Sequence, residues 1–405
     1  MKRWLAIAIL LLLMLTAWFF NRQSAINPHA TWDQQVYIWQ RVWTPQHRDA
    51  LTASHDLFST LRILGLQVHP QEGVRKIAVN TTWLKQDGRP LWLVVRLDGQ
   101  LQQLDESAIY PQLQQLLQQW QTAGLQVIGV EIDHDAATAR LPAYQHFLQQ
   151  LRQQLPSSLQ LGITALPTWL GSPALPSVLQ QVDSSVLQLH AVLSPEQGLF
   201  DGKQALDWVR QYARISSKPF SVALPTYGMG LFGFDTQGAL VESESAQHVA
   251  GNLQELSVAP QQIADFLQQL IQLSPAHLRG IIWFRLPLAG DRRAWSMDTL
   301  HAVITQQPLT VNWQVEFLPQ PPQNGLYDLN IKNNGPVDAP LPSEIRIQAE
   351  GCLAADAVGN YQLTTPSQPP RFIRIRSDQL RAGQSRPLGW VRCQQITPGG
   401  TYVIP

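Results

Sequence analysis

The sequence predicts an α/β protein in which a (β/α)8 TIM barrel precedes a small all-β domain of the sandwich type. Apolar runs typical of buried strands alternate with helical patterns over roughly 270 residues, which is the order expected of a barrel of parallel strands. From residue 309 to the end, apolar and polar residues alternate and helical spacing is absent. A doubly wound sheet is the rival fold, but no glycine-rich phosphate loop follows an early strand.

The predicted barrel strands are apolar runs of strand length with helix-forming segments between them. They are Val36–Val42, Lys76–Asn80, Leu91–Leu97, Val127–Asp133, Leu159–Leu166, Val186–Val192, Phe220–Pro225 and Gly280–Leu286. Between the fourth and fifth runs, Tyr144, Phe147, Leu148 and Leu151 have the spacing of a helix with one apolar face. The segment 228–260 is long for a single connection, so we expect an insertion on the loop side of the barrel.

The C-terminal domain, residues 309–405, contains both cysteines of the chain, Cys352 and Cys393. Strict alternation from Val311 to Phe317 begins a series of strand-like segments separated by turns. If the cysteines pair, their Cα atoms lie within about 7 Å, and the closed loop contributes ~4 kcal/mol in the chain-entropy model. Two buried free thiols are the alternative.

The composition limits the classes of partner. The chain has 405 residues, and 29 Lys and Arg balance 29 Asp and Glu, so the formal charge is zero. Such a chain lacks the basic footprint that favours nucleic acids or anionic membrane surfaces. We therefore expect no nucleic-acid partner, and no motif in the sequence indicates a cofactor.

Residues 1–25 are predicted to form a transmembrane signal anchor. A basic pair precedes an apolar run from Trp4 to Phe20, which is at the short limit for a spanning helix. With the basic end in the cytoplasm, the barrel (residues 30–307) and the C-terminal domain lie in the periplasm, anchored to the inner membrane. Cleavage after Ala25, which leaves a soluble periplasmic protein, is the alternative.

The fourth predicted strand ends in carboxylates at alternate positions, Glu131, Asp133 and Asp135. Residues two apart in a strand point to the same side, so the three carboxylates line one face while Val130 and Ile132 pack on the other. Each charge raises the pKa of its neighbour and loses hydration on burial. A solvated strand end or a structural hydrogen-bond network is one interpretation, and a catalytic or ligand-binding site is the other.

The ends of other predicted strands bring polar and aromatic residues to the same end of the barrel. These residues are Gln188 and His190 on the sixth strand, Tyr227 after the seventh, and Trp283 and Arg285 on the eighth. Carboxylates ringed by aromatic rings and hydrogen-bonding groups suit a sugar. Taken alone, Trp283 could equally be core and His190 a structural histidine. The convergence of several strand ends favours a site.

Between about residues 125 and 290, the chain resembles the family 18 glycoside hydrolases, the chitinase-like barrels. Their fourth strand reads D-G-x-D-x-D-x-E, and Gly129-x-Glu131-x-Asp133-x-Asp135 occupies the same frame, with Ile128 in place of the first Asp. Residues 161–167 are similar to their fifth strand, 182–190 to the sixth, 224–228 to the seventh and 280–283 to the eighth. The combination of anchor, barrel and β module also resembles a bacterial family known only as a domain of unknown function.

The resemblance implies a role for each matching position. In family 18 the last acid of the motif protonates the glycosidic oxygen, while the N-acetyl oxygen of the substrate attacks the anomeric carbon. Carried over, Asp135 is the acid, Asp133 its partner, Tyr227 the support of the acetamide and Trp283 the platform under the sugar. Further candidates for substrate contacts are Glu131, Gln188, His190 and Arg285.

Departures from the family pattern leave alternatives open. Asp135 is one methylene shorter than the family's Glu, and a displacement of about 1 Å can lower a rate 100-fold. Gln188 and His190 replace residues that hold the acetamide, so the glycan need not be N-acetylated.

An exported glycoside hydrolase acting on an envelope or extracellular glycan is the leading hypothesis. The second is a non-catalytic glycan-binding or envelope-assembly protein. The third is a metal-dependent hydrolase that uses Glu131, Asp133, Asp135 and His190.

Overall fold

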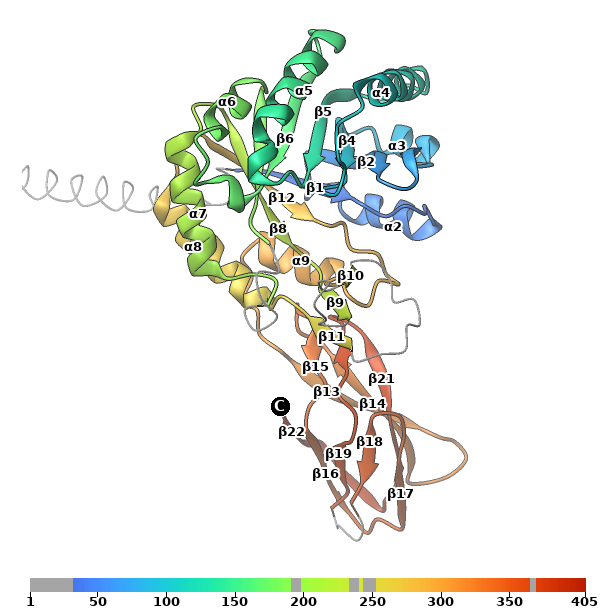
Figure 1. Ribbon diagram of the computed structural model, residues 1–405. Coiled ribbons are helices and arrows are strands. Elements are labelled where there is room, and N and C mark those ends of the chain that lie inside the picture. The colour runs from blue at the N-terminus through green and yellow to red at the C-terminus, as the bar shows by residue number, and fades with distance from the viewer. Residues whose placement is uncertain (1–31, 191–197, 233–239, 243–252, 365–368) are drawn as a thin grey trace, which may run out of the picture.

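The computed structural model describes residues 32–190, 198–232, 240–242, 253–364 and 369–405 (Figure 1). The predicted signal anchor, residues 1–25, lies outside these ranges. Within them, no helix has both the length and the apolar character needed to cross a membrane.

In the described part of the chain, eight parallel strands close into a barrel. They are β1 (Asp33–Ile38), β2 (Thr60–His69), β4 (Leu91–Leu97), β5 (Val127–His134), β6 (Gln160–Ala165), β7 (Ser184–Gln188), β8 (Phe220–Pro225) and β12 (Leu278–Phe284). Each strand pairs with its neighbour in sequence order, and pairing of β1 with both β2 and β12 closes the ring. The predicted TIM barrel is confirmed.

Helices follow the strands and pack around the barrel (Figure 1). They are α2 (Pro45–Ala53), α3 (Thr81–Asp87), α4 (Glu106–Thr122), α5 (Leu141–Gln154), α6 (Leu175–Gln180), α7 (Gly202–Ile215), α8 (Pro260–Leu273) and α9 (Met297–Ile304), with short 3-10 turns at Thr138–Arg140 and Pro167–Trp169. The apolar face of α5 buries Tyr144, Phe147 and Leu151 in the layer between helices and strands. The spacing of three and four residues therefore made this helix predictable.

The second strand of the barrel differs from the prediction. The segment Lys76–Asn80 is not a barrel strand, and β2 takes that place. A short strand, β3 (Gly73–Lys76), pairs antiparallel with the C-terminal part of β2. Because β2 is buried on both faces, it reads as a nearly continuous apolar run rather than an alternating one, and a charged residue, Arg62, interrupts it.

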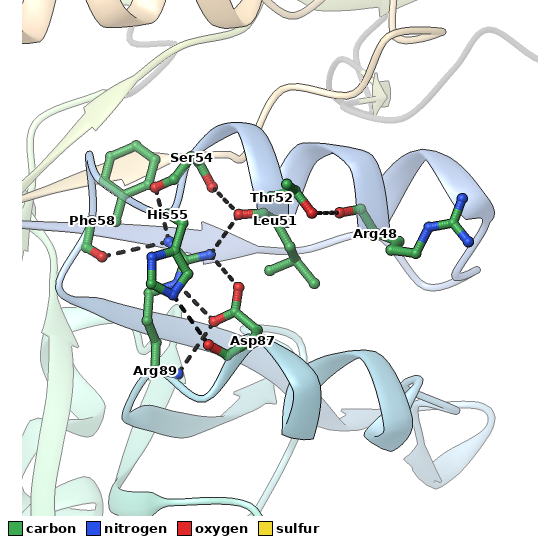
Figure 2. A network of polar contacts seen from close by, with 8 residues as sticks. All are labelled: Arg48, Leu51, Thr52, Ser54, His55, Phe58, Asp87 and Arg89. Atoms are coloured by element: carbon green, nitrogen blue, oxygen red, sulfur yellow. Dashed lines mark hydrogen bonds and ion pairs between the residues drawn. The ribbon is translucent and has the colours of Figure 1, made fainter.

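Arg89 secures the end of the barrel at which the strands begin (Figure 2). Its buried guanidinium donates to the backbone oxygens of Leu51 and Ser54, both at 3.0 Å, at the C-terminal end of α2. It also pairs with Asp87 at 2.6 Å. These bonds satisfy carbonyls that a helix end leaves without intrahelical partners. The network lies immediately before β4, at the opposite end from the residues predicted to be functional.

The long connection between β8 and α8 carries additional strands, as the length of segment 228–260 predicted. Among the residues described there, β9 (Met229–Phe232) pairs with both β10 (Leu240–Glu242) and β11 (Leu253–Leu256) in an antiparallel sheet. Because β9 follows the end of β8, this insertion rises from the loop side of the barrel.

The C-terminal domain packs two antiparallel sheets face to face. In the described ranges, one sheet contains β13 (Trp313–Pro319), β14 (Leu326–Asn333), β21 (Ser385–Arg392) and β17 (Ala354–Ala357). The other contains β18 (Tyr361–Leu363), β19 (Arg371–Arg374), β16 (Glu344–Glu350) and β22 (Gln395–Ile404), and a small pair joins β15 (Ala339–Pro340) to β20 (Gln379–Leu380). Leu329 and Val391 of the first sheet share a core with Ile345 and Phe372 of the second.

Cys352 and Cys393 form a disulfide in this domain, with Cα atoms 3.8 Å apart. The predicted proximity of the two cysteines is therefore confirmed. The bridge joins the loop before β17 to the residue after β21, two strands that are paired in the same sheet.

Backbone and side-chain hydrogen bonds hold the C-terminal domain against the connection between β12 and α9. The carboxylate of Asp338 accepts from the backbone nitrogens of Ser296 at 2.7 Å and Ala382 at 3.0 Å. Arg381 donates to the backbone oxygen of Ala289 at 2.8 Å. Since that connection follows the end of a barrel strand, the domain approaches the barrel on its loop side, as Figure 1 shows.

Candidate functional site

A cluster of charged residues lies where β4 and β5 end. Arg96 and Asp133 are direct partners in the parallel sheet, and Arg96 Nη1 donates to Asp133 Oδ2 at 2.7 Å. The other terminal nitrogen of Arg96 pairs with Asp135 Oδ2. One guanidinium thus connects two carboxylates at the C-terminal end of the barrel. We call Arg96, Asp133 and Asp135 the mouth cluster.

Asp133 is the least well paired carboxylate of the mouth cluster. It is 4% exposed, and its Oδ1 is buried with no hydrogen-bond partner among the described residues. Burial raises the pKa of Asp133 to about 6, because the ionised form loses hydration; Arg96 opposes this rise, and the charge of Asp135 adds to it. Asp133 therefore changes its protonation state close to neutral pH.

Arg96 keeps its charge in this setting. Burial lowers the pKa of Arg96, but the two carboxylates raise it by more, so the net effect is a pKa above the usual value. The side chain of Asp135 is 38% exposed, in contrast to that of Asp133. The mouth cluster therefore presents one buried and one accessible carboxylate on a permanently charged arginine.

Glu131 belongs to a second cluster, deeper in the barrel. Its carboxylate is completely buried and pairs with Arg62 of β2. Tyr37 donates to Glu131 Oε1 at 2.5 Å, and Thr164 donates to the same oxygen at 2.8 Å. The guanidinium of Arg62 also lies 4.6 Å from the centroid of the Trp92 ring. We call Tyr37, Arg62, Glu131 and Thr164 the interior cluster.

The interior cluster changes the interpretation of Glu131. The prediction that Glu131, Asp133 and Asp135 share one face of the strand agrees with the structure, since all three bind groups inside or at the mouth of the barrel. The predicted substrate contact by Glu131 does not fit its position, because both of its oxygens are already bound and the residue is sealed from solvent.

Aromatic rings line the mouth around Phe284. Its ring centroid lies 5.0 Å from that of Trp39, 5.2 Å from that of His190 and 5.3 Å from that of Tyr227. Trp39 and Phe284 are each only partly buried and pack against the apolar interior of the barrel. We call Trp39, His190, Tyr227 and Phe284 the aromatic cluster.

His190 and Tyr227 are buried members of this cluster. Burial lowers the pKa of His190 to about 4, so the imidazole is neutral at pH 7; its Nδ1 has no partner in the described part of the chain. Burial also raises the pKa of Tyr227 above its usual value. Gln188 donates to the backbone oxygen of His190 at 2.9 Å, which helps to hold that strand end. The charge of Asp135 raises the pKa of His190, against the larger effect of burial.

Trp283 does not lie at the mouth. It is fully buried on the helix-facing side of β12, near Leu267 of α8 and Ile304 of α9, and its Nε1 donates to Gln34 at 2.8 Å. Alternation explains the difference: Ile282 and Phe284 point into the barrel, so Trp283 between them points out. The predicted sugar platform at Trp283 is wrong, and Phe284 has the inward position.

Arg285 lies behind the aromatic cluster. It is almost fully buried, pairs with Asp291 at 2.5 Å and places its guanidinium 5.7 Å from the centroid of the Tyr227 ring. Its Nε and Nη1 are buried with no hydrogen-bond partner among the described residues. The predicted contact of Arg285 with a substrate stays a prediction.

The described residues include no group of three or more His, Cys, Asp or Glu side chains arranged to hold a metal ion. Glu131, Asp133, Asp135 and His190, the residues of the metal-site hypothesis, are all described and do not form such a group. The arginines Arg62 and Arg96 occupy the places that an ion would need beside these carboxylates.

Six residues of the three clusters were not predicted. They are Arg96 of the mouth cluster, Trp39 and Phe284 of the aromatic cluster, and Tyr37, Arg62 and Thr164 of the interior cluster. A signal for the arginines exists in the sequence, since a single cation inside an apolar strand needs a buried anion. Trp39 lies just beyond the end of β1, where barrel enzymes place ligand-contacting residues.

The comparisons with solved structures find distant barrels. The spore cortex-lytic enzyme SleL of Bacillus cereus is 14% identical, with a TM-score of 0.47 over 69% of this chain and 75% of that one. A chitinase from Chromobacterium violaceum is 12% identical, with a TM-score of 0.47 over 68% of this chain and 98% of that one. These values assign no activity to this chain. A search of curated proteins found no match.

Two family models match the chain. The model of a second domain of unknown function, DUF8456, matches residues 316–394, within the sandwich. Residues 87–289, which include the strands that carry the mouth cluster and Phe284, match the model described as Domain of unknown function (DUF3142). By this match over half of its length, the chain belongs to the DUF3142 family.

Proposed function

We propose that this protein hydrolyses glycosidic bonds in a glycan that binds across the mouth of the barrel. The observation that carries the proposal is Asp133, a nearly buried carboxyl whose pKa is raised to about 6 beside a second, accessible carboxylate. Most glycosidases use a pair of carboxyl groups in different environments as catalytic residues, because one must donate a proton while the other stays ionised.

In this proposal Asp133 is the proton donor. Its Oδ2 is bound to Arg96, whereas Oδ1 can hold a proton without loss of that bond. The O–H of Asp133 gives its proton to the glycosidic oxygen as the bond to the anomeric carbon breaks. Because Oδ1 is buried, the step requires the carboxyl to turn toward the mouth.

Asp135 is the partner in this reaction. The resemblance to family 18 assigns the acid to Asp135, but the side chain of this residue is 38% exposed and its carboxylate pairs with Arg96. In this proposal the carboxylate of Asp135 stabilises the positive charge that develops on the sugar ring. A water molecule then bonds to the anomeric carbon and gives up a proton, which restores the carboxyl of Asp133. The proposed roles are therefore the reverse of those that the resemblance implies: Asp133 is the acid and Asp135 is its partner.

The aromatic cluster provides the surface on which a sugar ring packs. Trp39 and Phe284 are both partly exposed and stand 5.0 Å apart, edge to face. Apolar ring surface beside hydrogen-bonding groups is typical of small-molecule sites. Trp39 takes the role that the sequence assigned to Trp283.

The test is a screen of envelope and extracellular glycans, N-acetylated ones included, for release of reducing ends by the full chain. Asp133→Asn keeps the shape of the side chain but removes the transferable proton, so hydrolysis should fall by roughly 100-fold or more. Activity should also decline as pH rises above about 6, where Asp133 ionises. Unchanged cleavage by Asp133→Asn would remove Asp133 as the donor.

A second function, glycan binding without cleavage, is favoured by one observation. Arg96 binds both carboxylates of the mouth cluster, and an ion-pair network of this kind suits binding as well as chemistry. In that case the same screen gives binding with no release of reducing ends at any pH between 4 and 8. Replacement of Trp39 by Ala should then weaken binding, and Asp133→Asn should leave it unchanged.

We further propose that the protein is anchored to the inner membrane by residues 1–25, with both domains in the periplasm. The apolar run from Trp4 to Phe20 after a basic pair supports this location. Fractionation of cells checks it: the full-length chain should stay with the membranes. A soluble periplasmic form beginning near residue 26 would show that the segment is cleaved.

A further inference from the structure

We infer that a cavity beside the aromatic cluster binds a second, uncharged sugar unit of the glycan, through oxygen atoms that accept hydrogen bonds from Arg285 and His47. The inference rests on the proposed function in one respect, that the ligand is a glycan. The cavity has a volume of about 340 Å³, which is within the range of small-molecule sites. Its lining includes Gln40, Thr44, His47, Arg285, Leu288 and Asp291. We call it the rim cavity.

The rim cavity lies between the connections that follow β1 and β12, two strands that are paired in the barrel. Gln40 comes directly after Trp39, and Arg285 comes directly after Phe284. The guanidinium of Arg285 also lies 5.7 Å from the centroid of the Tyr227 ring. The cavity therefore adjoins the aromatic cluster, so a glycan with one sugar unit packed on Trp39 and Phe284 can place the next unit in the cavity.

Hydrogen bonds between separate segments hold the walls of the rim cavity in place. Gln40 donates from Nε2 to the backbone oxygen of Leu286 at 3.1 Å, which joins the two connections. The backbone nitrogen of Gly290 donates to Oε1 of Gln46 at 3.2 Å, which ties the second connection to the first turn of α2. Because these bonds fix the walls, little ordering is needed when a ligand binds.

Arg285 supplies two hydrogen-bond donors to the rim cavity. Its Nη2 donates to Asp291 Oδ2 at 2.5 Å, whereas its Nε and Nη1 are buried with no partner among the described residues. The other oxygen of Asp291 accepts from the backbone nitrogen of Arg293 at 3.1 Å. Arg41, an exposed residue of the lining, already donates to Gln67 at 3.0 Å. Since Asp291 balances the charge of Arg285, the guanidinium needs acceptor atoms rather than a further anion.

His47 supplies a third donor. The residue is completely buried, and burial lowers the pKa of its imidazole, which is therefore neutral at pH 7. Its Nδ1 accepts from the backbone nitrogen of Thr44 at 3.0 Å, which places the single ring proton on Nε2. Nε2 is buried with no partner in the described part of the chain. The ring of Trp43 stacks on that of His47, with centroids 4.8 Å apart, and helps to fix its orientation.

These donors define the chemistry of the ligand. Nε and Nη1 of Arg285 and Nε2 of His47 all carry hydrogen, so the ligand must present acceptor oxygens. The hydroxyl and ring oxygens of a sugar and the carbonyl oxygen of an acetamide group are such acceptors, and none of them is charged. Leu288 adds an apolar wall for the C–H surface of a sugar ring. A neutral sugar unit therefore matches both the polar and the apolar parts of the rim cavity.

The test measures how affinity changes with the length of neutral oligosaccharides. Chito-oligosaccharides and cello-oligosaccharides, each from the monosaccharide to the tetrasaccharide, are the probes, since they share a linkage and differ in the acetamide group. Binding is measured by calorimetry on the full chain carrying Asp133→Asn, so that cleavage does not interfere. In at least one series, the unit that reaches the rim cavity should raise the affinity about tenfold in a single step. A step in the chito series alone identifies the acetamide carbonyl as the acceptor, and a step in both series identifies sugar oxygens.

Two variants then assign the step to the rim cavity. Arg285→Lys keeps a cation beside Asp291 but lacks the Nε and Nη1 donors. His47→Asn keeps an acceptor for the backbone nitrogen of Thr44 but lacks the Nε2 donor. Each variant should lose most of the tenfold step and keep the wild-type affinity for oligosaccharides that are too short to reach the cavity.

Arg89→Lys is the matched control. Arg89 is likewise a buried arginine paired with an aspartate, Asp87, at the opposite end of the barrel (Figure 2). Because it secures the far end of α2, the control shows whether loosening of that helix alone removes the step. It should lower stability and leave the step unchanged. In nitrogen-15 NMR, the signals of Arg285 Nε and His47 Nε2 should shift with the longer oligosaccharides only, and that of Arg89 Nε should not shift.

Several results would overturn the inference: no step in either series, which is the result for a cavity filled by water only, a step that persists in both variants, or an equal loss of the step in Arg89→Lys. These results are distinct from failure of the proposed function. Cleavage of a glycan by the wild-type chain without a step rejects the second sugar site and retains the hydrolase. A step that depends on Arg285 and His47, without cleavage by the wild-type chain, retains the second sugar site and rejects the hydrolase.

Discussion

The interior cluster and the mouth cluster stand one above the other on β5, yet they are built in opposite ways. In the interior cluster a single carboxylate, that of Glu131, binds Arg62, Tyr37 and Thr164 and is completely buried. In the mouth cluster one arginine serves two carboxylates, and Asp133 Oδ1 has no partner within the described ranges. Of two acidic residues at alternate positions of one strand, Glu131 has partners for both oxygens and Asp133 lacks a partner for one.

This difference distinguishes a structural ion pair, that of Glu131, from a carboxyl group suited to catalysis, that of Asp133. Buried ion pairs persist where additional hydrogen bonds satisfy the remaining lone pairs, which is the case at Glu131. A buried carboxylate that lacks such bonds raises its own pKa, as Asp133 does, and groups of this kind concentrate at functional sites.

The largest effect on stability is expected from Glu131→Gln. The substitution keeps the size of the side chain but leaves the guanidinium of Arg62 buried without an anion, so the free energy of unfolding should fall by about 3–5 kcal/mol. Chemical denaturation followed by circular dichroism measures it. Asp207→Asn, which breaks an exposed pair on α7, is the control and should change stability by less than about 1 kcal/mol. Equal effects of the two variants would contradict a structural role for the interior cluster.

Asp133→Asn should change how stability depends on pH. The pKa of Asp133 is about 6 in the folded chain and near 3.8 when unfolded, so the folded state binds more protons between these values. The destabilisation due to its charge is therefore fully present above about pH 6 and disappears as pH falls toward 4. It is on the order of 3 kcal/mol.

Denaturation of the wild type and of Asp133→Asn at pH 4 and pH 8 measures this effect. The variant should gain relative to the wild type at pH 8 and lose that gain at pH 4. His190, whose pKa is lowered to about 4, acts with the opposite sign, because its burial as neutral imidazole loses stability as pH falls from 6.5 toward 4. It is present in both proteins and cancels in the difference. Parallel pH curves would show that Asp133 titrates normally.

Arg96→Gln should raise the pKa of Asp133 further. The guanidinium is the group that lowers this pKa, so its removal leaves burial and the charge of Asp135 unopposed. An upward shift of at least about one unit is expected. Carbon-13 NMR of the Asp133 carboxyl measures it directly, and the alkaline limit of any hydrolysis should move to higher pH with it. A downward shift would contradict the ion pair between Arg96 and Asp133.

The barrel, the sandwich and the face shared by Glu131, Asp133 and Asp135 could be predicted because each depends on local periodicity. Alternation within one strand places these carboxylates together whatever surrounds the strand. The second barrel strand was missed for the same reason: β2 is buried on both faces and has no alternation to detect.

The partners of the carboxylates could not be predicted, because they depend on register between strands distant in sequence. Arg62 and Arg96 meet Glu131 and Asp133 only through the pairing of β2, β4 and β5. The prediction for Trp283 assigned the wrong residue of β12 to the inward face. A shift of one residue exchanges the inward and outward faces of a strand, so the sequence alone did not decide between Trp283 and Phe284.

Asp135→Asn is expected to have the smallest effect, and it is the sharpest test of the mouth cluster. The side chain is more than a third exposed, so its pair with Arg96 contributes little to folding and stability should change by less than about 1 kcal/mol. The charge of Asp135 raises the pKa of Asp133, and its removal also leaves Arg96 to Asp133 alone. Both changes act in the same direction, so the pKa of Asp133 should fall by up to about one unit. The same NMR titration measures this fall, and its sign is opposite to that in Arg96→Gln. If both variants left the pKa of Asp133 unchanged, the three residues would not act as one electrostatic unit, and the raised pKa would come from burial alone.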